Sequence, residues 1–192
     1  MAIVNVQIGR GVRIPQADLV NLYGCTIGDE TMIGTFVEIQ AGANIGKRCR
    51  IQSHSFICEG VSIGDGVFVG HGVIFTNDRH PRSVRSDGEL VGRNDWTMET
   101  TVVEDGASIG SGAVILPGVV IGANALIGAG AVVTRDVEAN AVVIGNPART
   151  VRSSTTSRTE SDEKRSKLYL SLSLTAFALS VTAVIALMRW IA

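Results

Sequence analysis

The chain of 192 residues is poor in aromatic residues, which make up 5% of it, as expected where aliphatic side chains line a narrow interior. Its only cysteines are Cys25, Cys49 and Cys58. Their odd number and the absence of a C-x-x-C pair exclude a disulfide framework and a zinc site of common spacing, and they favour a reducing cytosol. A formal net charge of −1 gives no bias toward nucleic acid. The first residues show no secretory signal pattern.

One class of residue returns with a fixed period. A branched aliphatic residue, once replaced by phenylalanine, stands at every sixth position in two runs. These positions are Ile27, Ile33, Ile39, Ile45, Ile51, Ile57, Ile63, Val69 and Phe75, and then Val103, Ile109, Ile115, Ile121, Ile127 and Val133. A helix repeats its apolar face every three to four residues and a strand every two, so this period matches neither. It is typical of a solenoid whose coil has three flat sides, each a short strand followed by a turn.

The residue four positions after each aliphatic is small or β-branched, as at Thr31 and Ala43. We expect the large residue to fill the interior and the small one to fit a tight corner. Glycine often follows the aliphatic, as at Gly28 and Gly46, and its conformational freedom suits a backbone that bends at every corner.

Three hexads make one coil, which stacks Ile27, Ile45 and Ile63 at a strand spacing of about 4.8 Å. The hexads, counted from Ile8, predict about six coils and a prism on the order of 29 Å tall. A β-sandwich is the alternative, but its strands and turns vary in length.

The period breaks between Phe75 and Val103, which are separated by far more than the single hexad that an unbroken repeat would place there. The sequence therefore predicts a loop over residues 76–102 that projects from one corner while the coils on either side still stack. Loops on rigid scaffolds often carry function. The alternative is an inert surface insertion.

The tail differs in composition from the repeats. Residues 153–167 are polar and predict a linker. Leu168–Met188 carries no charged residue, and as a helix it is about 31 Å long, which matches a bilayer core. We expect a C-terminal transmembrane helix over residues 168–190. The basic residues that precede it favour a body held at the cytoplasmic face of the membrane. The alternative is a C-terminal helix packed on the prism.

The segments FTNDRHPR and GNPAR, with the hexads between them, resemble the hexapeptide-repeat acyltransferases, and within these the bacterial nucleotide-sugar N-acetyltransferases. The resemblance implies an all-β, left-handed parallel β-helix over residues 1–152 and an acetyl-CoA-dependent acyltransferase. It also implies an acceptor amino group on a nucleotide-linked amino sugar and a homotrimer with sites between subunits. No metal and no nucleic acid are expected as partners.

The candidate catalytic residues lie at the start of the loop. The resemblance places Asn77 at the reaction centre, where its amide can orient the amine. Asp78 can hold the amine or accept its proton, and its alternative role is to cap the loop. His80 is a candidate base. Arg79 and Arg82 are candidate substrate-binding residues.

His54 and His71 are separated by nearly one coil of the sequence, and they are candidate substrate-binding residues or packing residues. Small residues after the loop would let the pantetheine arm of the coenzyme approach the backbone, and arginines in the last coils match its phosphates. The candidate coenzyme-binding residues are Ser108, Gly110, Gly128, Ala129, Arg135, Arg149 and Arg152.

Two other functions stay open. One is an O-acetyltransferase of a sugar or small alcohol with His80 as its base. The other is a membrane-tethered β-helix scaffold without catalysis.

Overall fold

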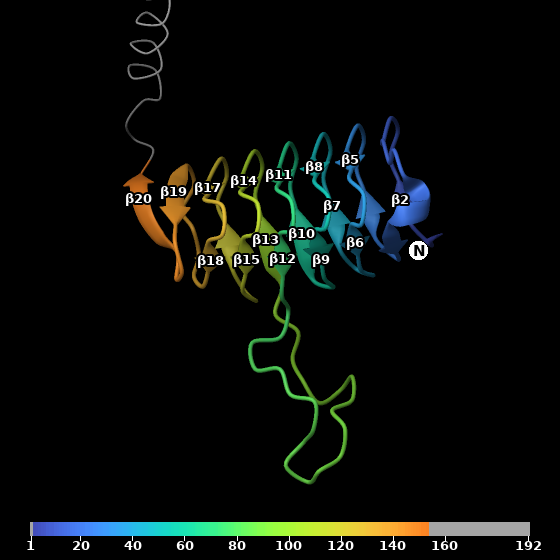
Figure 1. Cartoon of the computed structure of the whole chain (residues 1–192), viewed down its shortest axis with the longest axis vertical. Helices are drawn as coiled ribbons and strands as arrows, with labels where there is room; N and C mark the ends of the chain where they lie inside the picture. The colour runs from blue at the N-terminus through green and yellow to red at the C-terminus, as the bar shows by residue number, and fades with distance from the viewer. Residues whose placement is uncertain (1, 154–192) are drawn as a thin grey trace, which may run out of the picture. The chain divides into compact units, whose positions relative to one another are not determined.

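The computed structural model describes residues 2–153, which form a solenoid of three sheets, parallel except for the last strand, with one long loop projecting from it (Figure 1). Side A consists of β1 (Ile3–Val4), β3 (Asn21–Tyr23), β6 (Glu38–Ile39), β9 (Phe56–Ile57), β12 (Ile74–Phe75), β15 (Val114–Ile115) and β18 (Val132–Val133). Side B consists of β2 (Gln7–Ile8), β4 (Thr26–Ile27), β7 (Asn44–Ile45), β10 (Val61–Ile63), β13 (Thr101–Val103) and β16 (Val120–Ile121). Side C consists of β5 (Met32–Ile33), β8 (Arg50–Ile51), β11 (Phe68–Val69), β14 (Ser108–Ile109), β17 (Leu126–Ile127), β19 (Ala141–Ile144) and β20 (Arg149–Ser153).

The pairing register confirms the predicted coil. Ile27 pairs with Ile45 and Ile45 pairs with Ile63, so each partner lies three hexads further along the chain. Across the interruption the partner lies one coil and the whole loop further along, as in the pair Phe75 and Ile115. The same displacement occurs on sides B and C, so the extra residues leave the solenoid without disturbing its stacking. The left hand of the coil, taken from the resemblance, stays a prediction.

The interior is filled as the period predicts. All the aliphatic positions of the two runs are buried, and so are the small residues at the corners. Two of the buried polar corner residues bond to the neighbouring coil: Thr31 Oγ1 donates to the Gly46 carbonyl at 2.9 Å, and Ser55 Oγ donates to the Gly70 carbonyl at 2.9 Å. The hydroxyl of Thr101, at the start of β13, has no such partner among the described residues. Contacts between coils therefore bury the apolar corner residues and accept the hydrogen bonds of Thr31 and Ser55.

Glycine after the aliphatic has a different reason from the one we expected. Gly28 and Gly46 do not have a positive φ. A Cβ at Gly28 would lie 2.6 Å from the carbonyl carbon of Gly46, so these glycines allow close approach of successive coils. The positive φ that bends the chain falls two residues later, where glycine is optional: Glu30 and His54 adopt it too, at 60° and 62°.

The two ends of the solenoid differ. Near the N-terminus the 3₁₀ helix η1 (Ala17–Leu19) interrupts the strand pattern. At the other end β20 turns back and pairs antiparallel with β19, through a turn that contains the cis peptide bond Asn146–Pro147. The GNPAR segment thus closes the last coil, and the reversed strand covers the open edge of side C.

The expected architecture included a C-terminal transmembrane helix and a membrane-anchored location, and both expectations are corrected. No helix within residues 2–153 is long and apolar enough to cross a membrane. The predicted span 168–190 and the linker before it lie outside the described residues. An uncharged run of suitable length is only a necessary condition for a spanning helix, because serine and threonine side chains compete for backbone hydrogen bonds.

Candidate functional site

The long loop leaves side A after β12 and re-enters side B at β13, so it comprises residues 76–100, and the last two residues of the predicted range belong to β13. Its two ends are joined at the base, where the Glu99 amide donates to the Asn77 carbonyl at 3.0 Å. The Asn77 side chain is also fixed: its Nδ2 donates to the Glu59 carbonyl of the preceding coil at 3.1 Å. This contact leaves Oδ1 of Asn77 as an acceptor for a ligand.

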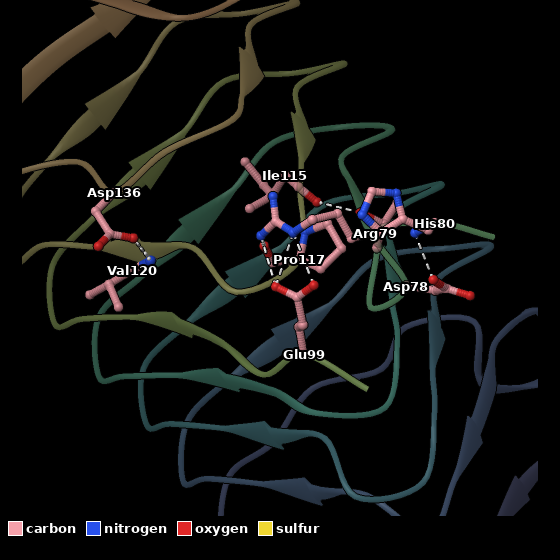
Figure 2. A network of polar contacts seen from close by, with 9 residues as sticks. Asp78, Arg79, His80, Glu99, Ile115, Pro117, Val120 and Asp136 are labelled. Carbon is pink, nitrogen blue, oxygen red and sulfur yellow. Dashed lines mark hydrogen bonds and ion pairs between the residues drawn. The ribbon is translucent and has the colours of Figure 1, made fainter. Parts of the chain in front are cut away.

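A second set of contacts ties the loop to the following coil (Figure 2). The Arg79 guanidinium donates to both carboxylate oxygens of Glu99, with Nε 2.9 Å from Oε1 and Nη2 2.8 Å from Oε2. Nη2 also donates to the Pro117 carbonyl at 2.6 Å. The hydrogen bonds from Arg79 lower the pKa of Glu99, and those same bonds raise the pKa of Arg79. We call these contacts of Arg79 with Glu99 and Pro117 the clamp, because they join the loop to the following coil. The expected role of Arg79 in substrate binding stays a prediction.

Asp78 and His80 stand just beyond the base of the loop. The His80 amide donates to Asp78 Oδ1 at 2.8 Å, so the aspartate does cap the chain as its alternative role requires (Figure 2). Asp78 is half-buried and the His80 ring is exposed. Both residues line two adjoining hollows of about 440 Å³ and 290 Å³, which also share Asp95 and Trp96. Arg82 lines the larger hollow. The structure thus brings Asp78, His80 and Arg82 together.

The other predicted histidines lie at a different corner, where the chain passes from side C to side A. Ser53 Oγ lies 2.8 Å from His71 Nδ1, and the His71 amide donates to Ser111 Oγ at 3.1 Å. The His54 ring packs against Phe36, with centroids 4.9 Å apart. Within one chain, therefore, His54 and His71 do not join the loop residues.

The predicted coenzyme residues divide as well. Gly110, Gly128 and Ala129 lie at the same C-to-A corner as His71, and Ser108 lies on β14 next to it. Arg135 and Arg149 line a hollow of about 160 Å³ at the C-terminal end of the prism. Arg135 and Arg149 thus form a second group, separate from the small residues at the C-to-A corner. Arg152 belongs to β20, and its side chain is not among those described.

The cysteines do not contribute a nucleophile. All three are free and buried, and burial raises the pKa of Cys58 to about 11. A buried thiol of high pKa carries little of the reactive thiolate. Within the described range, no group of three or more His, Cys, Asp or Glu side chains is placed to hold a metal ion.

Comparison with known families agrees with this architecture. The model of the bacterial transferase hexapeptide (six repeats) matches residues 24–59 and 100–135. The hexapeptide repeat of succinyl-transferase matches residues 45–77. A bifunctional GlmU protein of Streptomyces griseus is 36% identical over 81 residues, which cover 38% of this chain and 16% of that protein. The chain therefore spans less than a fifth of the length of this curated relative.

Solved structures share the fold. A hexapeptide-repeat acetyltransferase of Vibrio cholerae, VCA0836, determined with acetyl coenzyme A, is 28% identical with a TM-score of 0.59, over 73% of this chain and 75% of that one. A galactoside acetyltransferase in complex with coenzyme A is 28% identical with a TM-score of 0.51, over 70% and 64%. AntD of Bacillus cereus, an N-acyltransferase determined with dTDP and coenzyme A, has a TM-score of 0.65 at 18% identity, over 85% and 90%, and shows the fold alone.

Fold and repeats define the class, a β-solenoid built from transferase hexapeptides. The expected resemblance to hexapeptide-repeat transferases is confirmed, since the chain carries their repeats and is similar in sequence and fold to acetyltransferases of this type.

Proposed function

We propose that this protein transfers the acetyl group of acetyl-CoA to the amino group of a nucleotide-linked amino sugar. The observation that carries the proposal is the placement of Asp78 in the wall of two adjoining hollows, next in the chain to Asn77, whose side chain is held by Glu59, on a solenoid of transferase hexapeptides. The acetyltransferases of similar sequence and fold that were determined with acetyl coenzyme A or coenzyme A support the donor. The FTNDRHPR segment and its resemblance to sugar N-acetyltransferases support the acceptor.

The chemistry needs no nucleophile from the protein. The acceptor amine attacks the thioester carbonyl, a C–N bond forms, and the C–S bond breaks to release coenzyme A. Holding the two substrates in line supplies much of the rate. Asn77 Oδ1 accepts a hydrogen bond from the amine and orients it, since Nδ2 is already committed to Glu59. Asp78 receives the amine proton, which finally reaches the departing thiolate.

The working unit in this proposal is a homotrimer. One chain holds its candidate residues at two separate corners, the loop residues at one and His71 with the small residues at the other. Packing the loop of one copy against the C-to-A corner of a second copy would unite them. A mixture of Asn77→Ala and His71→Ala chains, refolded together, should then regain activity that neither variant has alone. If verified mixed assemblies stay inactive, that result would contradict a site shared between subunits.

O-acetyl transfer stays the second candidate because His80 borders both hollows, where it could serve as a base toward a hydroxyl. Its ring has no hydrogen-bond partner among residues 2–153 to orient it, and the catalytic histidine of serine hydrolases has such a partner. Amine transfer therefore fits the geometry better.

The test is turnover of acetyl-CoA over a panel of nucleotide-linked amino sugars and hydroxyl acceptors. We expect turnover with an amino sugar, a loss of about 100-fold or more in Asn77→Ala and survival in His80→Gln. Full loss in His80→Gln with turnover of a hydroxyl acceptor would establish O-transfer instead. Failure of the purified protein to bind coenzyme A would favour a β-helix scaffold without catalysis.

A further inference from the structure

The arginines of the loop are not equivalent. Arg79 pairs with Glu99, Arg85 pairs with Asp87 and Asp95, and Arg93 pairs with Glu59. Arg82 forms no ion pair with any residue in the described range, yet it lines the larger hollow. A guanidinium that lines a hollow and forms no ion pair within the protein is available to an anionic ligand.

The two hollows also differ in charge. The larger one has two carboxylates in its wall, Asp78 and Asp95, against two arginines and His80. The smaller one keeps both of these carboxylates and adds Glu99, against Arg79 and His80. The larger hollow is thus the more cationic and the smaller the more acidic.

We propose that the larger hollow is a nucleoside diphosphate subsite in which Arg82 binds the diphosphate, while the smaller hollow receives the amino group of the sugar. This inference rests on the proposed function and specifies how the acceptor lies. The diphosphate meets the unpaired guanidinium, whose planar fork matches phosphate oxygens. The amino group meets the carboxylate of Asp78, which both hollows share. Trp96 lies along the same shared wall, where its ring can pack against the sugar.

Arg85 cannot take the place of Arg82. Its Nη2 lies 3.0 Å from Asp87 Oδ2 and its Nη1 lies 3.3 Å from Asp95 Oδ2, so two carboxylates already neutralise it. A phosphate that approached Arg85 would have to displace them. The site therefore depends on one arginine, and this makes it testable by one substitution.

The probes are UDP, dTDP, uridine and thymidine, titrated into the full chain by calorimetry without coenzyme. We expect at least one nucleoside diphosphate to bind, and its nucleoside to bind far more weakly. Arg82→Gln should weaken nucleoside diphosphate binding about 10-fold to 100-fold, the loss expected for a charged hydrogen bond, and Arg82→Lys should weaken it less. Arg93→Gln is the matched control, because Arg93 is 83% exposed and outside both hollows, and it should stay within about 2-fold.

Equal losses in Arg82→Gln and Arg93→Gln would overturn the subsite, and so would the absence of nucleoside diphosphate binding up to millimolar concentration. Arg82-dependent binding without turnover of any amino sugar would support the subsite while removing the proposed function. Turnover with an unchanged KM in Arg82→Gln would support the function and overturn the subsite.

Discussion

In the prism, buried aliphatics recur at every sixth position, and the neighbouring coil accepts hydrogen bonds from the corner hydroxyls of Thr31 and Ser55. In the loop, residues 81–90 are all exposed, and the fixed points are ion pairs and a few backbone bonds. The prism is therefore stabilised by repetition, since each coil packs on its neighbours. The loop depends on individual contacts, and this leaves its side chains available to a ligand.

The largest contrast should appear between the losses of folding stability when a buried and an exposed aliphatic residue are each replaced by alanine. Ile57 is fully buried in the prism and Leu90 is 76% exposed in the loop. Ile57→Ala should lower the free energy of unfolding by about 2–5 kcal/mol. Leu90→Ala should change it by less than about 0.5 kcal/mol. Urea denaturation measures both, and similar losses would show that the loop belongs to the cooperative core.

Two glycines sharpen the same comparison. A Cβ at Gly28 in the prism would lie 2.6 Å from backbone of the next coil, whereas one at Gly92 in the loop would meet only an Asp95 side-chain oxygen at 3.3 Å. Gly28→Ala should cost about 1–3 kcal/mol, because the coils must separate locally. Gly92→Ala should have a much smaller effect on the same denaturation curve. A neutral Gly28→Ala would contradict the close-approach account.

The clamp tests whether the loop is placed by its ion pair. Arg79→Gln should lower kcat more than it raises KM, because Arg79 positions Asn77 and Asp78 through Glu99 and Pro117. The same substitution should change the free energy of unfolding little, since the pair is partly exposed to solvent. The reversed pair, Arg79→Glu with Glu99→Arg, should recover part of kcat. A rise in KM alone would indicate that Arg79 binds the substrate, as the sequence predicted.

The clamp also has a pH dependence with a definite sign. The pKa of Glu99 is lowered in the folded protein by the hydrogen bonds from Arg79. The contribution of the pair is thus fully present above the ordinary glutamate pKa of 4.5 and is lost as pH falls through the lowered value. Protease cleavage in the loop should increase in that acid range, and Glu99→Gln should be cleaved readily at neutral pH too. Equal cleavage of the two proteins at neutral pH would contradict the clamp.

The smallest effect concerns the thiols. The pKa of Cys58 is raised by burial from 9.0 to about 11, so the contribution of its neutral thiol to stability is fully present below pH 9 and is lost as pH rises through about 11. The native cysteines should react with a thiol reagent only as fast as the prism opens, at every pH below 9. Ser83→Cys in the exposed loop should react at once, and rapid labelling of the native cysteines would contradict their burial.

Part of the site has a signal in the sequence. At the A-to-B corner, from which the loop projects, the residue after the aliphatic carries a side chain, as at Gln40, Cys58, Thr76, Leu116 and Thr134. At the other two corners this position is mostly glycine. Glu59, which holds Asn77, and the clamp partners Glu99 and Pro117 gave no such signal, because they come from different coils or turns and their pairing depends on how the loop folds back.

The sequence by itself determined the solenoid, its register of three hexads per coil and the place of the interruption, because a repeated pattern of large, small and glycine residues has one compact way to bury its apolar side. Only the tertiary structure decided which histidines lie at another corner, which arginines of the loop are neutralised, and that Arg82 lines a hollow without an ion pair to a carboxylate of the described residues. Those outcomes depend on contacts between segments that are distant in the sequence, such as those of Arg79 with Glu99 and Pro117. No local period in the sequence encodes such contacts.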